Sequence, residues 1–236
     1  MAPVECALTG VHDPALRQSL HESFSKAVIP GLTQMVVSEQ EKAAFRTLSE
    51  QLISSIDPNA PRFARRCASI VAQSADVLDA LPAHAAAPGS IPADAWRSVN
   101  ELDAAGAKNA LAALADANGG SILLFAHSSH ILDAPMLGGR WSNQGQPPHS
   151  MGETLRRALG SRYVAIAEIE PVKPAPASAP PDLFQLLHPA CDQPCMVSAS
   201  GLQLHQVRIG NNGNDQQLID PTTAASFYLI IPEPSK

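Results

Sequence analysis

Four ionisable side chains of this sequence have the residue types that hydrolysis needs, and each follows a short apolar run: His12, Glu39, His127 and His130. A neutral imidazole titrates near neutrality and can take a proton from water, and a carboxylate beside it can fix its tautomer. Further imidazoles can donate hydrogen bonds to a developing oxyanion or hold a metal ion. The four residue types together therefore indicate a candidate hydrolytic site.

Each of these residues also has an interpretation without chemistry. His12 could cap the helix that follows it, and Glu39 suits the first turn of a helix, where the dipole favours a carboxylate. His127 and His130 could be polar residues of a loop. Their position after predicted strands favours a shared site, because the carboxyl ends of parallel strands meet at one edge of a sheet.

The strands that would position these residues are short and apolar. The first two are Val4–Thr9 and Gln34–Val37, and Ser121–Phe125 and Tyr163–Glu168 follow later in the chain. Ser121–Phe125 is wholly apolar after its serine, which is typical of a central strand covered on both faces. Strands and helices alternate over the first two-thirds of the sequence, so we predict an α/β fold, with a central, mainly parallel β-sheet flanked by helices.

Amphipathic helices are predicted between these strands, and two further strands close the chain. Five helices are predicted. The first starts at Asp13 and ends before Pro30, the second carries Phe45, Leu48, Leu52 and Ile56 on one face, and the third starts at Pro61. The last two are Ala93–Leu114 and Ser150–Leu159. Ser150 and Glu153 form a capping-box pattern at the start of the last helix. The final strands are Leu202–Ile209 and Phe227–Ile231.

Two further segments lead to specific expectations. His21 and Glu22 are neighbours in sequence, but adjacent helical residues point about 100° apart. We therefore expect His21 at most at the edge of a pocket and Glu22 on the surface. Asp133–Ser150 starts just after His130 and is rich in turn-forming residues. We predict that it has no regular structure, covers or rims the pocket, and moves more than the sheet.

Length, charge and hydropathy restrict the class of protein. The 236 residues are predicted to form a single domain, 1–236, with a proline-rich linker near 170–182. A net charge of −6 without a Lys/Arg stripe argues against nucleic acid as a partner. No apolar run approaches the roughly 18 residues of a membrane span, and we expect neither a membrane nor a signal peptide. The four cysteines are expected to be reduced thiols: Cys6, Cys67, Cys191 and Cys195.

One stretch of the chain resembles the erythromycin esterase family: ILLFAHSSHILDAPMLGGRWSNQGQPPHSMGETLRRALGSRYVAIA, from Ile122 to Ala167. That family has an apolar strand, an AHN-x-H motif, a variable loop, a helix with MG-x-x-LR-x-x-(L/F)G and a closing strand. The residues that match these motifs are Ala126, His127, His130, Met151, Gly152, Leu155, Arg156 and Gly160.

Weaker matches extend the resemblance toward both ends of the chain. ALTGVHDP resembles the first family motif, whose histidine is matched by His12, and MVVSE resembles the strand that ends in a catalytic glutamate, matched by Glu39. LDAAGAKN and SFYLIIPEPS resemble a middle motif and the last strand. The chain departs from the family where Thr9 and Gly10 replace the glutamate of the first motif, and where Ser128 replaces the asparagine between the histidines.

The resemblance implies the fold of the superfamily that contains the erythromycin esterases, the haem-binding ChaN lipoproteins and the TIKI (TraB) proteases, and it implies a hydrolase. His12 would be the base toward water, with Glu39 orienting it or a second water. His127 and His130 would stabilise developing negative charge or hold a metal. Because the missing motif glutamate removes an anionic metal ligand, we expect no cofactor.

In size the chain is similar to small type III effectors of plant-pathogenic bacteria that have this fold. This similarity implies a protein made in the bacterial cytoplasm and then secreted into the host cell, where it triggers plant cell death. Its substrate would be an unknown small molecule or host molecule, and a plant TIR-domain immune receptor would be an indirect partner. A non-catalytic ligand-binding or receptor-triggering module is one alternative, and a macrolide esterase is a more distant one.

Overall fold

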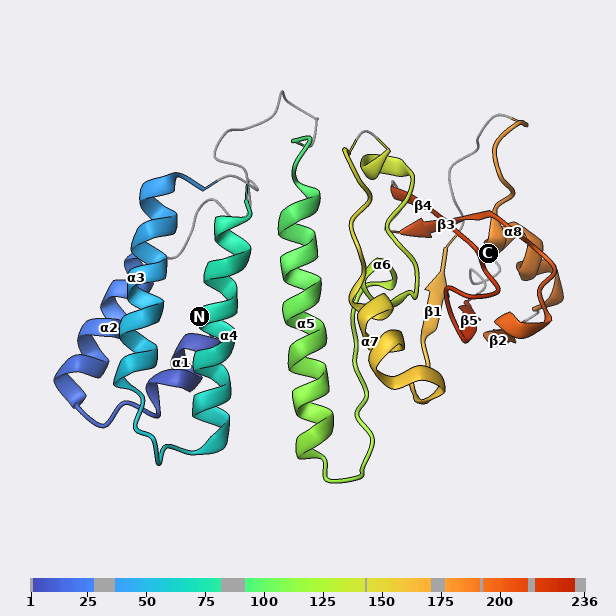
Figure 1. The fold of residues 1–236 in the computed structure, drawn as a ribbon. Helices are drawn as coiled ribbons and strands as arrows, with labels where there is room; N and C mark the ends of the chain where they lie inside the picture. Colours follow the sequence, from blue (N-terminus) through green and yellow to red (C-terminus); the bar gives the residue numbers. More distant parts are fainter. Residues whose placement is uncertain are drawn as a thin grey trace. The chain divides into compact units, whose positions relative to one another are not determined.

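The computed structural model describes residues 2–27, 37–81, 92–142, 144–170, 177–191, 193–211 and 215–231. The chain divides into two compact units, unit 1 (Met1–Ala105) and unit 2 (Gly106–Lys236). The described part of unit 1 is helical, whereas unit 2 contains helices and all the described strands (Figure 1). None of the described helices combines the length and the apolar character needed to cross a bilayer.

Unit 1 packs four helices around an apolar core and also includes the start of a fifth helix. The helices are α1 (Ala2–Leu8), α2 (Pro14–Ala27), α3 (Glu39–Ser55), α4 (Arg62–Asp79) and the first half of α5 (Trp96–Asp116). Leu20, Phe24 and Leu52 are fully buried, and the ring of Phe24 meets that of Phe45 edge-on at 5.7 Å. The periodic apolar faces that predicted α2, α3 and α4 are therefore the faces that form the core.

The first predicted strand is wrong. Val4–Thr9 lies mainly in α1, whose buried residues are Val4, Ala7 and Leu8. Their i, i+3, i+4 spacing matches one face of a helix, and a six-residue apolar run does not by itself distinguish a helix from a strand. Of the second predicted strand, residues 34–36 lie outside the described residues.

Two disulfides replace the expected reduced thiols. Cys6 on α1 is bonded to Cys67 on α4, and Cys191 is bonded to Cys195. The first pair is separated by 61 residues in sequence, yet its Cα atoms are 5.8 Å apart, within the range that a disulfide spans. The packing of α1 against α4 produces this approach, which the spacing of the cysteines along the chain could not show.

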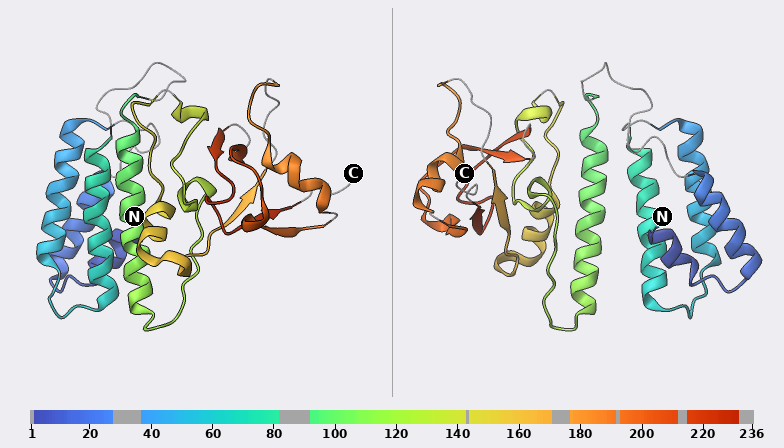
Figure 2. Two further views of the ribbon diagram at one scale, coloured as in Figure 1. Left: turned by 45° about the vertical axis from the view of Figure 1, so that its right-hand side comes forward. Right: turned by 180° about the vertical axis from the view of Figure 1, so that it is seen from behind.

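Unit 2 contains two small sheets (Figure 2). In the first, β5 (Phe227–Ile230) lies between β1 (Ile166–Ile169), which is parallel to it, and β2 (Cys195–Ser198), which is antiparallel. The second is an antiparallel pair of β3 (Val207–Asn211) and β4 (Asp215–Ile219). The α/β class is confirmed, while the parallel arrangement predicted for the central sheet is present in the β1–β5 pair.

The helices of unit 2 after α5 are short. They are α6 (Ser128–Ile131), η2 (Gly139–Trp141), α7 (Met151–Leu159), η3 (Gly160–Arg162), α8 (Leu183–Leu187), η4 (His188–Ala190) and η5 (Ala199–Gly201). The predicted capping box of α7 is confirmed, with Ser150 as N-cap and Glu153 bonded back to it. The side chains of α7 pack on α5 through Met151 and Ala107, both buried.

Ser121–Phe125 is not a central strand in the structure. This segment leaves the end of α5 and runs back as an extended chain toward α6, without pairing to any described strand (Figures 1 and 2). The side chains of Leu123 and Phe125 are 80% and 86% exposed. A wholly apolar run predicts burial only when neighbouring strands cover it, and no described strand lies beside it.

The long segment Asp133–Ser150 is anchored to the β3–β4 pair and does not lack regular structure. It contains η2, and Leu137 forms an isolated bridge with Leu218 of β4, whose N–H donates to the Leu137 carbonyl at 2.9 Å. The apolar side chain of Met136 is buried, although most of the surrounding sequence is polar. The prediction of an irregular segment is confirmed for most of its described residues and is wrong for η2 and for the bridge at Leu137.

Candidate functional site

His127 and His130 lie together in unit 2, at the start and in the last turn of α6. His127 is the N-cap residue, and its Nδ1 accepts a hydrogen bond from the Ser129 N–H at 3.4 Å and lies 2.8 Å from the Ser129 hydroxyl. The two imidazole centroids are 6.3 Å apart, with the rings 72° from parallel. Because Nδ1 accepts from a backbone N–H, the neutral His127 ring carries its proton on Nε2.

The turn that carries these histidines is held by three contacts, which we name the α6 clamp: Ser150, Gly152 and Tyr163. The Tyr163 hydroxyl donates to the carbonyl oxygen of Ile131 at 2.6 Å, and the Ser150 hydroxyl donates to that of Leu132. Gly152 packs so closely on both carbonyls that a Cβ at this position would overlap them. Burial raises the pKa of Tyr163 to about 12, so its hydroxyl remains a donor.

Arg156 joins α7 to the segments on either side of it. Its Nη1 donates to the carbonyl oxygens of Gly160 and Tyr163 at 2.9 and 2.7 Å, and its Nε donates to Oδ2 of Asp133 at 3.2 Å. Burial raises the pKa of Asp133, and the charge of Arg156 partly opposes this shift. Gly152 and Arg156 carry the family resemblance, and the structure gives each a local reason for its residue type.

His149 is a third imidazole close to this turn, and sequence analysis did not single it out. Its Nδ1 lies 3.1 Å from Oε2 of Glu153, which also accepts the Ser150 N–H at 2.9 Å in the capping box. The Met136 N–H, in the segment after α6, donates to the carbonyl oxygen of Pro148 at 2.8 Å. This bond holds Pro148, and with it the next residue His149, beside that segment. The i, i+4 spacing of His149 and Glu153 is the signal that could have identified this pair.

In unit 1, His12 lies between α1 and α2. Its side chain is 73% exposed, and its Nδ1 is 3.4 Å from Oδ2 of Asp57, which follows α3. His12 does not cap α2, because the N–H groups of Ala15 and Leu16 donate to Oδ1 of Asp13 at 2.9 and 3.3 Å. An exposed imidazole beside a carboxylate can exchange protons with water.

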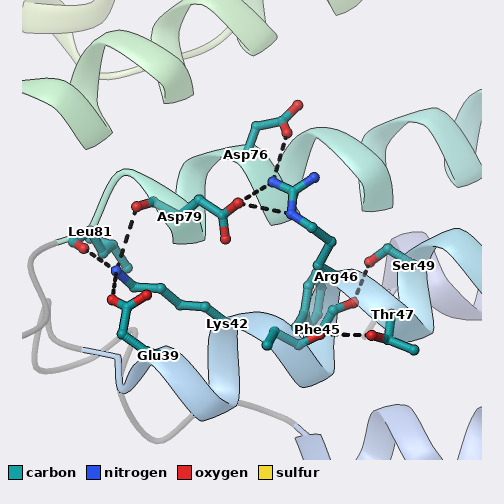
Figure 3. A network of polar contacts seen from close by, with 10 residues as sticks. Glu39, Lys42, Phe45, Arg46, Thr47, Ser49, Asp76, Asp79 and Leu81 are labelled. Carbon is teal, nitrogen blue, oxygen red and sulfur yellow. Dashed lines mark hydrogen bonds and ion pairs between the residues drawn. The ribbon is translucent and has the colours of Figure 1, made fainter.

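Glu39 is the first residue of α3 and is the counter-ion of a buried lysine (Figure 3). Its Oε1 lies 2.8 Å from Nζ of Lys42, whose side chain is 7% exposed while that of Glu39 is 75% exposed. Nζ also donates to the carbonyl oxygen of Leu81 at 2.6 Å, after the end of α4. Glu39 therefore helps to join the start of α3 to the end of α4, and the helix dipole favours its charge there.

The structure brings His127 and His130 together and separates His12 from Glu39. Asp57, the partner of His12, lies beyond the last residue of α3, whereas Glu39 is the first. A helix of 17 residues is roughly 24 Å long. The predicted convergence depended on strands before both residues, but the segment before His12 is helical and does not bring this side chain to a sheet edge.

A metal site is not evident among the described residues. No three His, Cys, Asp or Glu side chains gather there in a way that could hold a metal ion. His127 and His130 together supply two imidazole nitrogens, whereas a protein site for zinc has three or four ligands. The pair alone therefore supplies fewer ligands than such a site needs.

Comparison with known proteins identifies the family. A family model described as erythromycin esterase matches residues 7–168, whereas no curated protein matches the chain. Among solved structures, a histidine-to-asparagine mutant of the erythromycin esterase EreC, in its open conformation, has a similar fold, with a TM-score of 0.59 and 14% identity. The match covers 100% of this chain and 65% of that one, so the protein spans about two-thirds of the EreC chain. Since the family model covers more than half of its length, the chain belongs to the erythromycin esterase family.

Proposed function

We propose that this protein is a hydrolase-like effector that cleaves an ester bond, with the chemistry carried by His127 and His130. The observation that supports this assignment most strongly is their pairing on α6, with ring centroids 6.3 Å apart. Their surroundings support the assignment as well, because the α6 clamp fixes the backbone just after them.

The two histidines have different roles in this proposal. His130 takes a proton from a water molecule as the water oxygen attacks the ester carbonyl carbon. The Nε2–H of His127 donates a hydrogen bond to the oxyanion that develops on the carbonyl oxygen. The tetrahedral intermediate then collapses, the bond to the alkoxide breaks, and His130 returns the proton to the leaving alcohol.

His127 and His130 can be tested separately from His12. We expect His127→Ala and His130→Ala to lower the hydrolysis of a simple activated ester by about a hundredfold or more. His205→Ala, which removes an exposed imidazole of unit 2, is the matched control and should retain most activity. Loss of activity in His12→Ala, with His127→Ala unaffected, would instead support the sequence-based assignment of His12 as the base.

We further propose that the protein acts after type III secretion into a plant cell, where it triggers cell death that depends indirectly on a TIR-domain immune receptor. The resemblance of the chain to small type III effectors of this superfamily supports this role. Expression in leaf tissue, in plants with and without TIR-domain receptors, should produce cell death in the first case alone. A secretion-deficient bacterial strain should fail to release the protein.

A second candidate is a ligand-binding or receptor-triggering module without turnover. The separation of His12 from Glu39 favours it, as does the replacement of the motif glutamate by Thr9 and Gly10. The two candidates differ in one comparison, made in leaf tissue at equal protein levels. Cell death that persists in a His127→Ala, His130→Ala double variant would favour the module, and its loss would favour the hydrolase.

A further inference from the structure

An open surface cavity of about 390 Å³, lined mainly by exposed residues, lies between α1 and α2 in unit 1. Its lining consists of Glu5 and Leu8 from α1, Thr9 just after this helix, and Pro14, Arg17, Gln18 and His21 from α2. Glu5 and Leu8 are three residues apart, and Arg17 and His21 are four apart, so each pair lies on one side of its helix. The lining includes Leu8 and Thr9 of the first family motif, whereas His127 and His130 belong to unit 2.

His21 is paired with Glu5 on the other helix and not with its neighbour Glu22. Nε2 of His21 lies 2.8 Å from Oε1 of Glu5. Glu22 is exposed and accepts a hydrogen bond from Gln18 Nε2 at 2.7 Å. The prediction that Glu22 is a surface residue is confirmed, and His21 lines this cavity between α1 and α2.

Two charged groups of the lining retain bonding capacity after these contacts. Arg17 donates from Nε and Nη2 to the carbonyl oxygen of Val11 at 3.0 and 2.7 Å, and no described residue accepts a hydrogen bond from its Nη1. Glu5 contacts His21 through Oε1, and no described residue donates to its Oε2. Each side chain is therefore oriented by one contact while a second polar atom remains for a ligand.

We propose that this cavity binds a small zwitterion of the amino-acid class. The carboxylate of the ligand accepts from Nη1 of Arg17, its ammonium group donates to Oε2 of Glu5, and its side chain lies against Leu8. Charge complementarity supports this class, because the lining offers one permanent cation and one carboxylate. The cavity volume is also within the range of ligand pockets, about 300–1,000 Å³.

The disulfide between Cys6 and Cys67 contributes to the site indirectly. Cys6 follows Glu5 on α1, and the disulfide fixes this helix to α4. Because the carboxylate that would receive the ammonium group is held by a seven-residue helix, reduction of the disulfide should weaken binding. This effect does not require any contact between the ligand and sulfur.

Calorimetric titration of the 236-residue protein with L-leucine tests the proposal, with sodium acetate and methylammonium chloride as single-charge probes. L-leucine should bind at least about tenfold more tightly than either probe, because each probe lacks one charge-assisted hydrogen bond. Arg17→Gln and Glu5→Gln should each weaken L-leucine binding by about tenfold. Lys26→Gln and Glu50→Gln, which make the same changes of charge on exposed residues outside the cavity, should not.

Three outcomes would overturn the proposal: no heat of binding with L-leucine, equal affinity for acetate and L-leucine, or unchanged affinity in Glu5→Gln. Circular dichroism of each variant checks that it is folded. If Arg17→Gln does not fold because it loses the bonds to Val11, Glu5→Gln alone decides, since it preserves the shape of the side chain. None of these outcomes depends on hydrolysis, so they are distinct from failure of the proposed function.

Discussion

The two units use ionisable residues in different ways. In unit 1, His12 and Glu39 lie near opposite ends of α3, and each contacts a charged neighbour of its own, Asp57 and Lys42. In unit 2, His127 and His130 share a helix of four residues. Residues within one helical turn are close whatever the tertiary fold, whereas residues on separate elements meet only if the predicted topology is right.

The units also differ in how their chains are held. In unit 1, side chains join separate helices. The Cys6–Cys67 disulfide joins α1 to α4, and the buried ammonium of Lys42 joins α3 to the end of α4. The α6 clamp of unit 2 acts on backbone carbonyl groups within a short segment. Long-range links should therefore control the stability of unit 1, whereas local fit should control the geometry of the histidine pair.

The largest expected effect is that of the long-range disulfide. Replacing both Cys6 and Cys67 by Ser should lower the free energy of unfolding by about 4 kcal/mol, because the disulfide closes a loop of 61 residues in the unfolded chain. Replacing Cys191 and Cys195, which are 4 residues apart, should cost about 2 kcal/mol. Chemical denaturation with and without a reductant measures both, and equal losses for the two pairs would contradict the loop-closure argument.

The next effect compares the same substitution in each unit. Gly152→Ala should lower the free energy of unfolding by about 3 kcal/mol, because the new Cβ would overlap the carbonyl oxygens of Ile131 and Leu132. Gly10→Ala should cost less, about 2 kcal/mol, since the Cβ would meet Cδ1 of Ile56 at 3.1 Å and the Cβ atoms of Ala60 and Ala64 at 3.2 Å without overlapping any backbone atom. Thermal unfolding compares the two, and Gly145→Ala, with open space around it, is the control.

The same comparison has a readout at the histidines. If the α6 clamp positions His127 and His130, Gly152→Ala should change the imidazole NMR signals of both, and Gly10→Ala should leave them unchanged. Unchanged signals in a folded Gly152→Ala variant would show that the clamp does not control the pair.

These comparisons also show which features were accessible from sequence. The apolar residues of α2, α3 and α4 recur every three to four residues over several turns, so the sequence pattern predicts both the helix and the face that it buries. Val4–Thr9 and Ser121–Phe125 are too short to show a period, and the second is exposed although its composition predicts burial. The pairing of His127 with His130 follows from their spacing, whereas the contacts of Glu5 with His21 and of Cys6 with Cys67 depend on how helices pack.

Glu39 provides a smaller effect and tests whether its role is structural. Glu39→Gln should lower the free energy of unfolding by about 1 kcal/mol, because Lys42 keeps its bond to Leu81 and the exposed carboxylate is screened by solvent. His12→Ala should change it by less than about 0.5 kcal/mol, since this side chain is largely exposed. Urea unfolding distinguishes the two, and a larger loss in His12→Ala would show that its contact with Asp57 stabilises the fold.

The smallest effect concerns Asp133 and its dependence on pH. Folding raises the pKa of this carboxyl above its ordinary value of 3.8, chiefly through burial. Ionisation is therefore harder in the folded state, so the favourable contribution of the protonated group is present below the ordinary pKa and is lost as pH rises through the raised one. The Asn of the Asp133→Asn variant cannot ionise. As pH rises through the raised pKa, the free energy of unfolding of this variant should therefore increase relative to that of the natural protein, by less than about 1 kcal/mol. Thermal unfolding across acidic pH measures this difference, with Asp94→Asn as an exposed control. A relative stability that falls instead would show that attraction to Arg156 outweighs burial.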